Sequence, residues 1–286
     1  MSEVVLKEPP AVGPHRVVIE PPAGWASVDV RELWRFRELL FFLAWRDVKV
    51  RYKQTAFGVA WAVLQPAMMM VVFTVFFGRI AGISTGGVPQ PLFFLTGVLP
   101  WFFFSSSVAA GANSILGSER LISKIYFPRL TVPFAAVAAA AVDFVIACGL
   151  LGVMLVAYGV TPTWNLLLLP VVAFGVGLLA TGLGTFLAAL NVAYRDFKYV
   201  VPFMLQLGMF ATPTIYSRPT GAEGELIRWL LVVNPMTPLV EAFRACALGG
   251  PIPWAGMGVS LVVGLALLVV GCLYFRKVED RFADII

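Results

Sequence analysis

The sequence predicts an all-α protein that crosses a membrane several times. Of its 286 residues, 59% are hydrophobic and only 13% are charged, whereas a soluble domain carries about 25% charged residues. The mean hydropathy of +0.87 leaves too little polar surface to cover a globule in water. Long apolar stretches recur along the chain, at lengths near the roughly 20 residues that a helix needs to cross the hydrocarbon core. We therefore expect a polytopic helical membrane protein.

The chain begins with two segments that precede any span. Residues 1–30 are Pro-rich and lack periodicity, so we expect a flexible N-terminal tail. Residues 31–54 place most apolar side chains on one helical arc and most Arg and Lys side chains on the other, as in an amphipathic helix lying in the membrane interface. The candidate interfacial residues of this helix are Trp34, Arg37, Trp45 and Arg46. Three residues, Arg37, Asp47 and Arg51, depart from the pattern. A solvated helix packed on protein is the alternative.

A transmembrane domain over residues 55–278 follows, with a cytoplasmic tail at 276–286. Six stretches are apolar enough to span, and they cover residues 57–77, 92–116, 131–157, 166–190, 200–217 and 255–275. The fifth stretch is short and contains Pro202 and Pro213. Neighbouring helices can satisfy the backbone groups that such prolines free.

Residues 226–247 resemble a seventh span but are interrupted. Asn234, Pro235 and Pro238 divide the stretch, and Glu241 and Arg244 lie in its second half. Each half has about 10 residues, or roughly 15 Å as a helix, which is half a bilayer. We expect a re-entrant pair of short helices on the external face, between spans five and six.

The distribution of basic residues sets the orientation. With six spans and a cytoplasmic N-terminus, 17 of the 21 Lys and Arg residues fall in cytoplasmic segments, as the positive-inside rule requires. A seventh span would place Arg276, Lys277 and Arg281 outside. We therefore expect both termini in the cytoplasm, and we attribute the net charge of +5 to topology rather than to nucleic-acid binding.

The chain carries no recognisable catalytic, cofactor or metal motif. It has no Gly-Lys phosphate loop, no Cys or His pairs at metal-ligand spacing and no nucleophile elbow. Its three cysteines are far apart in apolar surroundings, which is typical of small buried hydrophobic residues. Any ATP hydrolysis must therefore come from a partner.

Asp143 is the one acidic residue deep in a predicted span. A carboxylate in a membrane is energetically costly and is a functional candidate for that reason. A proton relay is one interpretation, but no Lys, Arg or His occurs at similar depth in the other spans. Interhelical hydrogen bonding is the favoured interpretation.

Aromatic residues gather near the outer ends of spans two and five. Trp101, Phe104 and Tyr216 are candidates for a sugar translocation path, because aromatic faces can stack on a sliding chain. An aromatic belt at the membrane interface is the favoured alternative.

Residues 117–130 predict a short cytoplasmic helix between two spans. Ser118 can cap this helix, Glu119 suits its first turn and Pro128 ends it. Its apolar face fits either a plain connector or a knob that docks on a cytoplasmic partner.

Blocks of sequence from residue 31 to residue 286 resemble the type-2 ABC-exporter permeases of the polysaccharide and polyol-phosphate export group, which includes O-antigen and teichoic-acid permeases. The resemblance lies in blocks that include residues 33–40, Trp45-Arg46-Asp47-Val48-Lys49, Leu64-Gln65-Pro66, Gly97-Val98-Leu99-Pro100-Trp101, Ile122-Ser123-Lys124-Ile125-Tyr126-Phe127-Pro128-Arg129, Tyr194-Arg195-Asp196-Phe197, Asn234-Pro235-Met236, Glu241-Ala242-Phe243-Arg244 and Phe275-Arg276-Lys277-Val278-Glu279. The Pro-rich tail is not part of the pattern.

The resemblance implies a homodimer in the bacterial cytoplasmic (inner) membrane, with two ATP-binding cassette subunits that bind ATP and Mg²⁺. It implies that residues 118–127 couple to the ATPase, with Tyr126 and Phe127 packing in its cleft and Glu119, Arg120 and Lys124 orienting by charge. The halves of 222–248 become external gate helices carrying Asn234, Pro235, Glu241 and Arg244. The cargo becomes a lipid-linked glycan that passes along the dimer interface.

Three other functions stay open at this point. They are a small-molecule or drug permease of the same fold, a proton-coupled secondary transporter that uses Asp143, and a membrane enzyme or scaffold of a glycan assembly complex.

Overall fold

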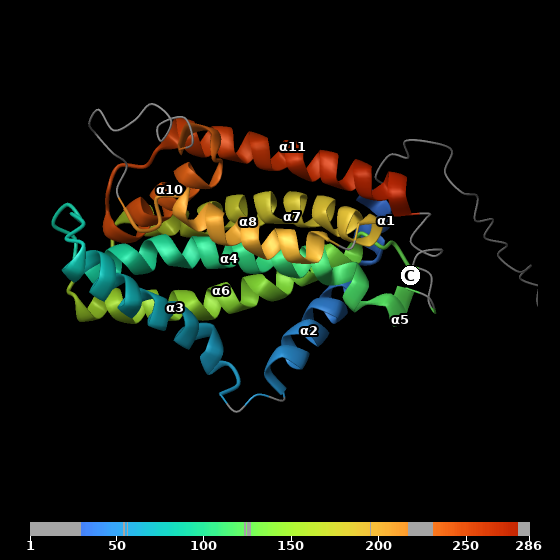
Figure 1. Ribbon diagram of the computed structural model, residues 1–286, viewed down its shortest axis with the longest axis horizontal. Helices are drawn as coiled ribbons and strands as arrows, with labels where there is room; N and C mark the ends of the chain where they lie inside the picture. The colour runs from blue at the N-terminus through green and yellow to red at the C-terminus, as the bar shows by residue number, and fades with distance from the viewer. Residues whose placement is uncertain are drawn as a thin grey trace, which may run out of the picture.

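The long helices lie alongside one another and connect two distinct ends of the molecule (Figure 1). The computed structural model describes residues 30–53, 55, 57–122, 124, 127–194, 196–216 and 231–279, and every regular element in these ranges is helical. One end holds α1 (Val30–Arg35), α5 (Glu119–Ile122) and the last turn of α11 (Trp254–Glu279). We call it the α5 end. The other holds α10 (Met236–Leu248) and is called the α10 end.

Five helical segments are long and apolar enough to cross a membrane. They are α3 (Ala60–Phe73) with the π-helical η1 (Thr74–Ile80), α4 (Gln90–Gly117), α6 (Thr131–Ala157), the 3₁₀ turn η2 (Trp164–Leu168) with α7 (Leu169–Ala193), and α11. Each overlaps one of the predicted spans, and α6 matches its predicted bounds. The chain is therefore a multi-pass helical membrane protein, as the sequence predicts.

The fifth predicted span, 200–217, differs from the others. It corresponds to α8 (Phe197–Phe210), which has only 14 residues, or about 21 Å of helix. Beyond α8 the chain turns through residues 211–216, and Pro213 lies in this turn, where it cannot continue a helix. Six spans therefore remain a prediction. The predicted tail 1–30, apart from the backbone of residue 30, and most of the first half of 226–247 lie outside the described residues.

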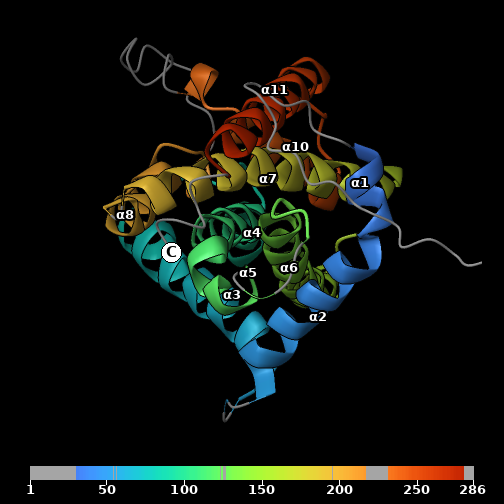
Figure 2. The same ribbon diagram turned by 90° about the vertical axis from the view of Figure 1, so that its right-hand side faces the viewer.

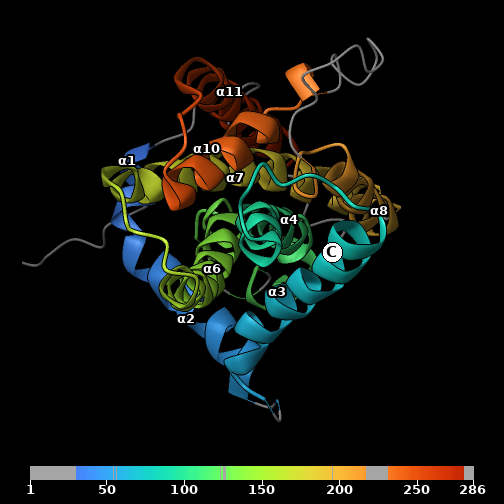
Figure 3. The same ribbon diagram turned by 90° about the vertical axis from the view of Figure 1, so that its left-hand side faces the viewer.

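Helix α4 runs through the middle of the bundle. Figures 2 and 3 show α3, α6, α7 and α8 arranged around it. Within its most apolar stretch 78% of the residues are buried, compared with 17% in the segment formed by α3 and η1. The main hydrophobic core therefore follows α4, and the apolar surface that α3 leaves exposed faces away from the chain's own core.

Glycine contacts let α4, α7 and α11 approach closely. A Cβ atom on Gly111 of α4 would lie 3.2 Å from the Cα of Gly184 in α7. A Cβ on Gly182, also in α7, would lie 2.5 Å from the backbone nitrogen of Leu268 in α11. Small residues at crossings are the usual way in which membrane helices bring their backbones together.

The predicted amphipathic helix 31–54 is two helices, α1 and α2 (Arg37–Lys53), joined at Phe36. Leu43, Ala44 and Val48 of α2 are buried, and the first two belong to a second hydrophobic cluster near the α5 end. Helix α2 packs on α6, and α2 and α3 together form a V beneath the bundle (Figure 1). Its last residues reach the level of Asp143, the thirteenth of the 27 residues of α6. This helix therefore extends from the α5 end to the middle of a span.

Candidate functional site

The α5 end carries the residues predicted to meet an ATPase. Glu119 and Arg120 lie on α5, and Lys124 follows it; all three are exposed. Phe127 is instead only 5% exposed and packs in the second cluster with Leu130 and Ile115. In this arrangement Phe127 contacts the chain's own core rather than a surface that a partner can reach. Tyr126 lies outside the described residues.

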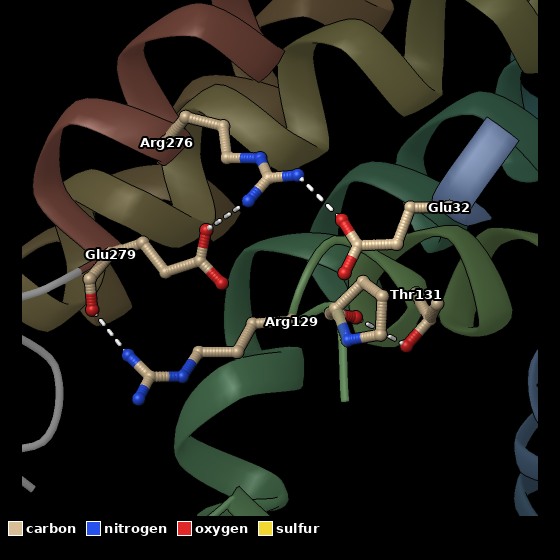
Figure 4. Close-up of polar contacts among 6 residues, drawn as sticks. Glu32, Arg129, Thr131, Arg276 and Glu279 are labelled. Atoms are coloured by element: carbon tan, nitrogen blue, oxygen red, sulfur yellow. Dashed lines mark hydrogen bonds and ion pairs between the residues drawn. The ribbon is translucent and has the colours of Figure 1, made fainter. Parts of the chain in front are cut away.

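A polar network ties three segments together at the same end (Figure 4). Nη2 of Arg276, near the end of α11, lies 3.1 Å from Oε2 of Glu32 in α1, and its Nη1 lies 3.7 Å from Oε2 of Glu279. Arg129, in the connection between α5 and α6, donates a hydrogen bond to the backbone carbonyl of Glu279 at the end of α11. A cation is favourable there because the carbonyl end of a helix carries partial negative charge. The network connects the α5 region, α1 and the last span.

The middle of the molecule holds a second polar group, centred on Asp143. The guanidinium of Arg51 forms an ion pair with this carboxylate, and the hydroxyl of Tyr52 donates a hydrogen bond to it. Both partners belong to α2, so Asp143 does make the interhelical hydrogen bond that the sequence favours. Arg51 lies in α2, outside the predicted spans, so the spans alone contain no charged partner for Asp143. Burial raises the pKa of the Tyr52 phenol, although Arg51 opposes the shift, so the phenol remains a donor at neutral pH.

These side chains border a cavity of about 600 Å³, within the usual size range of ligand pockets. Its wall combines aromatic rings with hydrogen-bonding side chains from α2, α3 and α4, next to small and apolar residues of α6 and α8. We call it the middle cavity. Its lining includes Arg51, Tyr52, Trp61, Gln65, Phe102, Ser105, Ser106, Ala109, Ala140 and Asp143.

At the α10 end, Asn234 holds the turn that follows α8. Its Nδ2 donates to Oγ1 of Thr212 at 2.8 Å and to the carbonyl of Ala211 at 3.3 Å. Its Oδ1 accepts from the backbone N–H of Met236 at 2.9 Å, at the first residue of α10. The next residue, Pro235, accepts a hydrogen bond from Ser260 of α11 at 2.8 Å. Asn234 and Pro235 thus join α10 to α8 and α11.

Arg244 holds the same turn from the other side. Its Nη2 donates to the carbonyls of Pro213 and Thr214 at 3.0 and 3.3 Å, and its guanidinium lies 3.9 Å from the centroid of the Phe93 ring. Burial lowers the pKa of Arg244 to about 10, and the Glu241 carboxylate opposes this shift. The guanidinium therefore stays charged at neutral pH. Asn234 and Arg244 thus hold residues 211–214 from two sides, and the Glu241 carboxylate lies close enough to Arg244 to affect its pKa.

The three aromatic path candidates do not line the middle cavity. Trp101 and Phe104 are 5% and 6% exposed and belong to the main hydrophobic core. The Trp101 ring packs over Gly208 of α8, where a Cβ would lie 2.8 Å from it. Tyr216 is half-buried, and its hydroxyl donates to the carbonyl of Phe210 at 3.2 Å. Other aromatic residues, Trp61 and Phe102, border the cavity instead.

The interfacial candidates on α1 and α2 remain largely accessible. Trp34 is 71% exposed beside the Arg37 guanidinium, and Trp45 is 48% exposed beside the Lys49 ammonium. Arg46 pairs with Asp47 at 2.8 Å. Part of the apolar arc thus packs on α6, and the rest remains available to lipid or to a partner.

Sequence reasoning missed several residues that complete these sites. Arg51 and Tyr52 were not linked to Asp143, and Thr212, Phe93 and Ser260 were not linked to α10. One signal was present, because Arg51 departs from the amphipathic pattern of its helix. Among the described residues, no group of three or more His, Cys, Asp or Glu side chains is arranged to hold a metal ion.

Comparison with known proteins gives consistent relatives. The pattern of the ABC-2 type transporter family matches residues 38–248. The O-antigen export system permease protein RfbA of Myxococcus xanthus is 33% identical over 257 residues, which cover 89% of this chain and 98% of the relative. A protein of the same name from Klebsiella pneumoniae is 26% identical, covering 87% and 95%. The polysialic acid transport protein KpsM of Escherichia coli is 22% identical, covering 82% and 91%.

Proposed function

The chain belongs to the ABC-2 type transporter family, and from this premise we propose that it is the permease subunit of an ATP-driven polysaccharide exporter. Its cargo is a lipid-linked glycan, O-antigen or a similar surface polysaccharide, which crosses the bacterial cytoplasmic membrane. The observation that carries the proposal is the match to an O-antigen export permease over 89% of this chain and 98% of that relative. The family pattern extends over residues 38–248, which include nearly all of α2 and the whole of α10.

The proposed topology has six spans and two cytoplasmic termini. Helix α8 and the turn after it form the fifth crossing, and residues 222–248 form the external re-entrant pair. The α5 end then faces the cytoplasm. Its exposed basic residues and the basic last turn of α11 support this orientation, because basic residues favour the cytoplasmic side.

The working complex contains two copies of this chain and two ATP-binding cassette subunits. ATP and Mg²⁺ bind to those partner subunits, and their closure acts on the permease through residues 118–127. Arg120 and Lys124 make the docking contacts, since both are exposed at the tip of the α5 end. Phe127 transmits the movement from inside the chain, because it is buried in the second cluster with Leu43 of α2.

Complementation tests this proposal. In a bacterium that lacks its own O-antigen permease, this chain and its partner ATPase should restore surface polysaccharide. The double variant Arg120→Glu/Lys124→Glu should lose most of that export, because reversed charge repels a docking surface that is complementary to the wild type. The amount of permease in the membrane should stay unchanged.

Arg79→Glu is the matched control, since Arg79 is an exposed basic residue in η1, near the α10 end. This variant should export normally. Full export by the double variant would show that α5 is not the docking element. Failure of the wild-type pair to move polysaccharide, with both subunits assembled, would argue against the polysaccharide assignment and favour a small-molecule cargo.

A further inference from the structure

A second cavity lies next to the middle cavity, toward the α5 end, and shares three of its helices. It has a volume of about 350 Å³ and is lined by residues of α2, α4 and α6, including Ser114 and Gly117 near the end of α4. We call it the end cavity. On both α4 and α6, two neighbouring residues line different cavities. On α4, Ala109 lines the middle cavity and Ala110 the end cavity, and on α6 the corresponding residues are Ala140 and Ala139.

Arg51 lies on the boundary, because it lines both cavities. From there its guanidinium pairs with Asp143, and Tyr52 donates to the same carboxylate. The side chains of Arg51 and Asp143 are 38% and 21% exposed, so neither is fully enclosed, and Asp143 borders the middle cavity. Arg51 is therefore a lining residue that the two cavities share, and it is held there by Tyr52 and Asp143, which line the middle cavity.

We propose that Arg51, held by Tyr52 and Asp143, forms a polar barrier between the two cavities of each subunit, and that substrate on its way to the dimer interface passes this point only when the Arg51–Asp143 pair separates. The second half rests on the proposed export function. Sugar hydroxyl groups both donate and accept hydrogen bonds. A passing glycan can therefore supply acceptors to Arg51 and donors to Asp143 while the two are apart. An apolar barrier could not form these hydrogen bonds with the glycan. An ion pair that separates without new partners leaves unpaired charges, which are energetically costly.

Helix α2 also gives the barrier a connection to the α5 end. Leu43 and Ala44 of α2 share the second cluster with Phe127, which follows the proposed docking residues. Glu32 of α1 binds Arg276 of α11. Movement at the docking surface can thus reach Arg51 through a packed helix of 17 residues. Arg51 and Asp143 act here as positioning residues that control passage.

Two nearly isosteric cysteine substitutions on α4 report the two cavities separately. Ser114→Cys lies in the end cavity and Ser105→Cys in the middle cavity, and both native hydroxyls donate to carbonyls of α4 itself. Each is placed in a full-length chain whose Cys148, Cys246 and Cys272 are replaced by Ala. The complex with its ATPase is embedded in inside-out vesicles, and a charged, membrane-impermeant thiol reagent is added outside them.

With the barrier intact, Ser114→Cys should react readily and Ser105→Cys slowly. Adding Asp143→Asn, which keeps an acceptor for Tyr52 but removes the ion pair, should raise the Ser105→Cys rate roughly tenfold, the scale expected for a half-buried pair. The Ser114→Cys rate should not change. Arg51→Lys should keep Ser105→Cys slow, and so should the exchanged pair Arg51→Asp/Asp143→Arg.

Equal reactivity of the two cysteines with the native pair present would overturn the barrier, as would an unchanged Ser105→Cys rate in Asp143→Asn. An altered Ser114→Cys rate in Asp143→Asn would also overturn it, because the whole region would then have rearranged. The role in passage is tested by adding ATP during measured export, when Ser105→Cys should react faster. An unchanged rate during active export would refute that role. The difference in thiol reaction rate between Ser105→Cys and Ser114→Cys is measured without substrate. It therefore tests the barrier independently of the proposed cargo.

Discussion

Replacing Arg244 by Met should destabilise the α10 end more than any single loss of surface charge. Met keeps a long side chain but leaves the carbonyls of Pro213 and Thr214 without their donor. A buried acceptor without a partner costs about 1–3 kcal/mol, and the contact with Phe93 adds roughly 1 kcal/mol. Removing the desolvation penalty of the guanidinium offsets part of this sum. We expect a net loss of about 3 kcal/mol in unfolding free energy.

The assay is reversible unfolding in mixed micelles, titrated with SDS and followed by tryptophan fluorescence. Arg79→Met removes an exposed arginine and should change stability by less than about 0.5 kcal/mol. Phe93→Leu, alone and combined with Arg244→Met, completes a double-mutant cycle that should give a coupling of about 1 kcal/mol. Stability of Arg244→Met equal to that of the Arg79 control would refute this account of how α10 holds the turn after α8.

Two further predictions concern helix packing and the network at the α5 end. Gly182→Val should destabilise the fold by about 1–3 kcal/mol, because its Cβ would meet the backbone of α11. The yield of folded protein in size-exclusion chromatography should therefore fall. Gly149→Val is the control, since a Cβ there meets nothing within 4 Å. Arg276→Glu should lower the SDS midpoint by placing a third carboxylate beside those of Glu32 and Glu279, and adding Glu32→Arg should restore much of it if the 3.1 Å contact is the cause. A double variant no more stable than Arg276→Glu alone would contradict that.

Much of the fold could be predicted because span length and apolarity are local properties of the chain. The predicted span 131–157 has the same bounds as α6, because its apolar run is long and begins three residues after Pro128. The fifth span was less secure for an equally local reason. Pro213 ends the regular helix before it is long enough to cross, and residues 211–214 then depend on Asn234 and Arg244, which are distant in sequence.

The sequence by itself thus determined the membrane class, five of the spans, the family resemblance and the candidate status of Asp143. Only the tertiary structure decided what surrounds these residues. It paired Asp143 with Arg51, 92 positions earlier in the chain, and buried Phe127 and Trp101 in hydrophobic clusters. Hydrophobic periodicity reports which residues avoid water, but it does not distinguish contact with lipid, with a partner or with the chain's own core. Helix packing makes that choice, and here it also places a polar contact between two cavities.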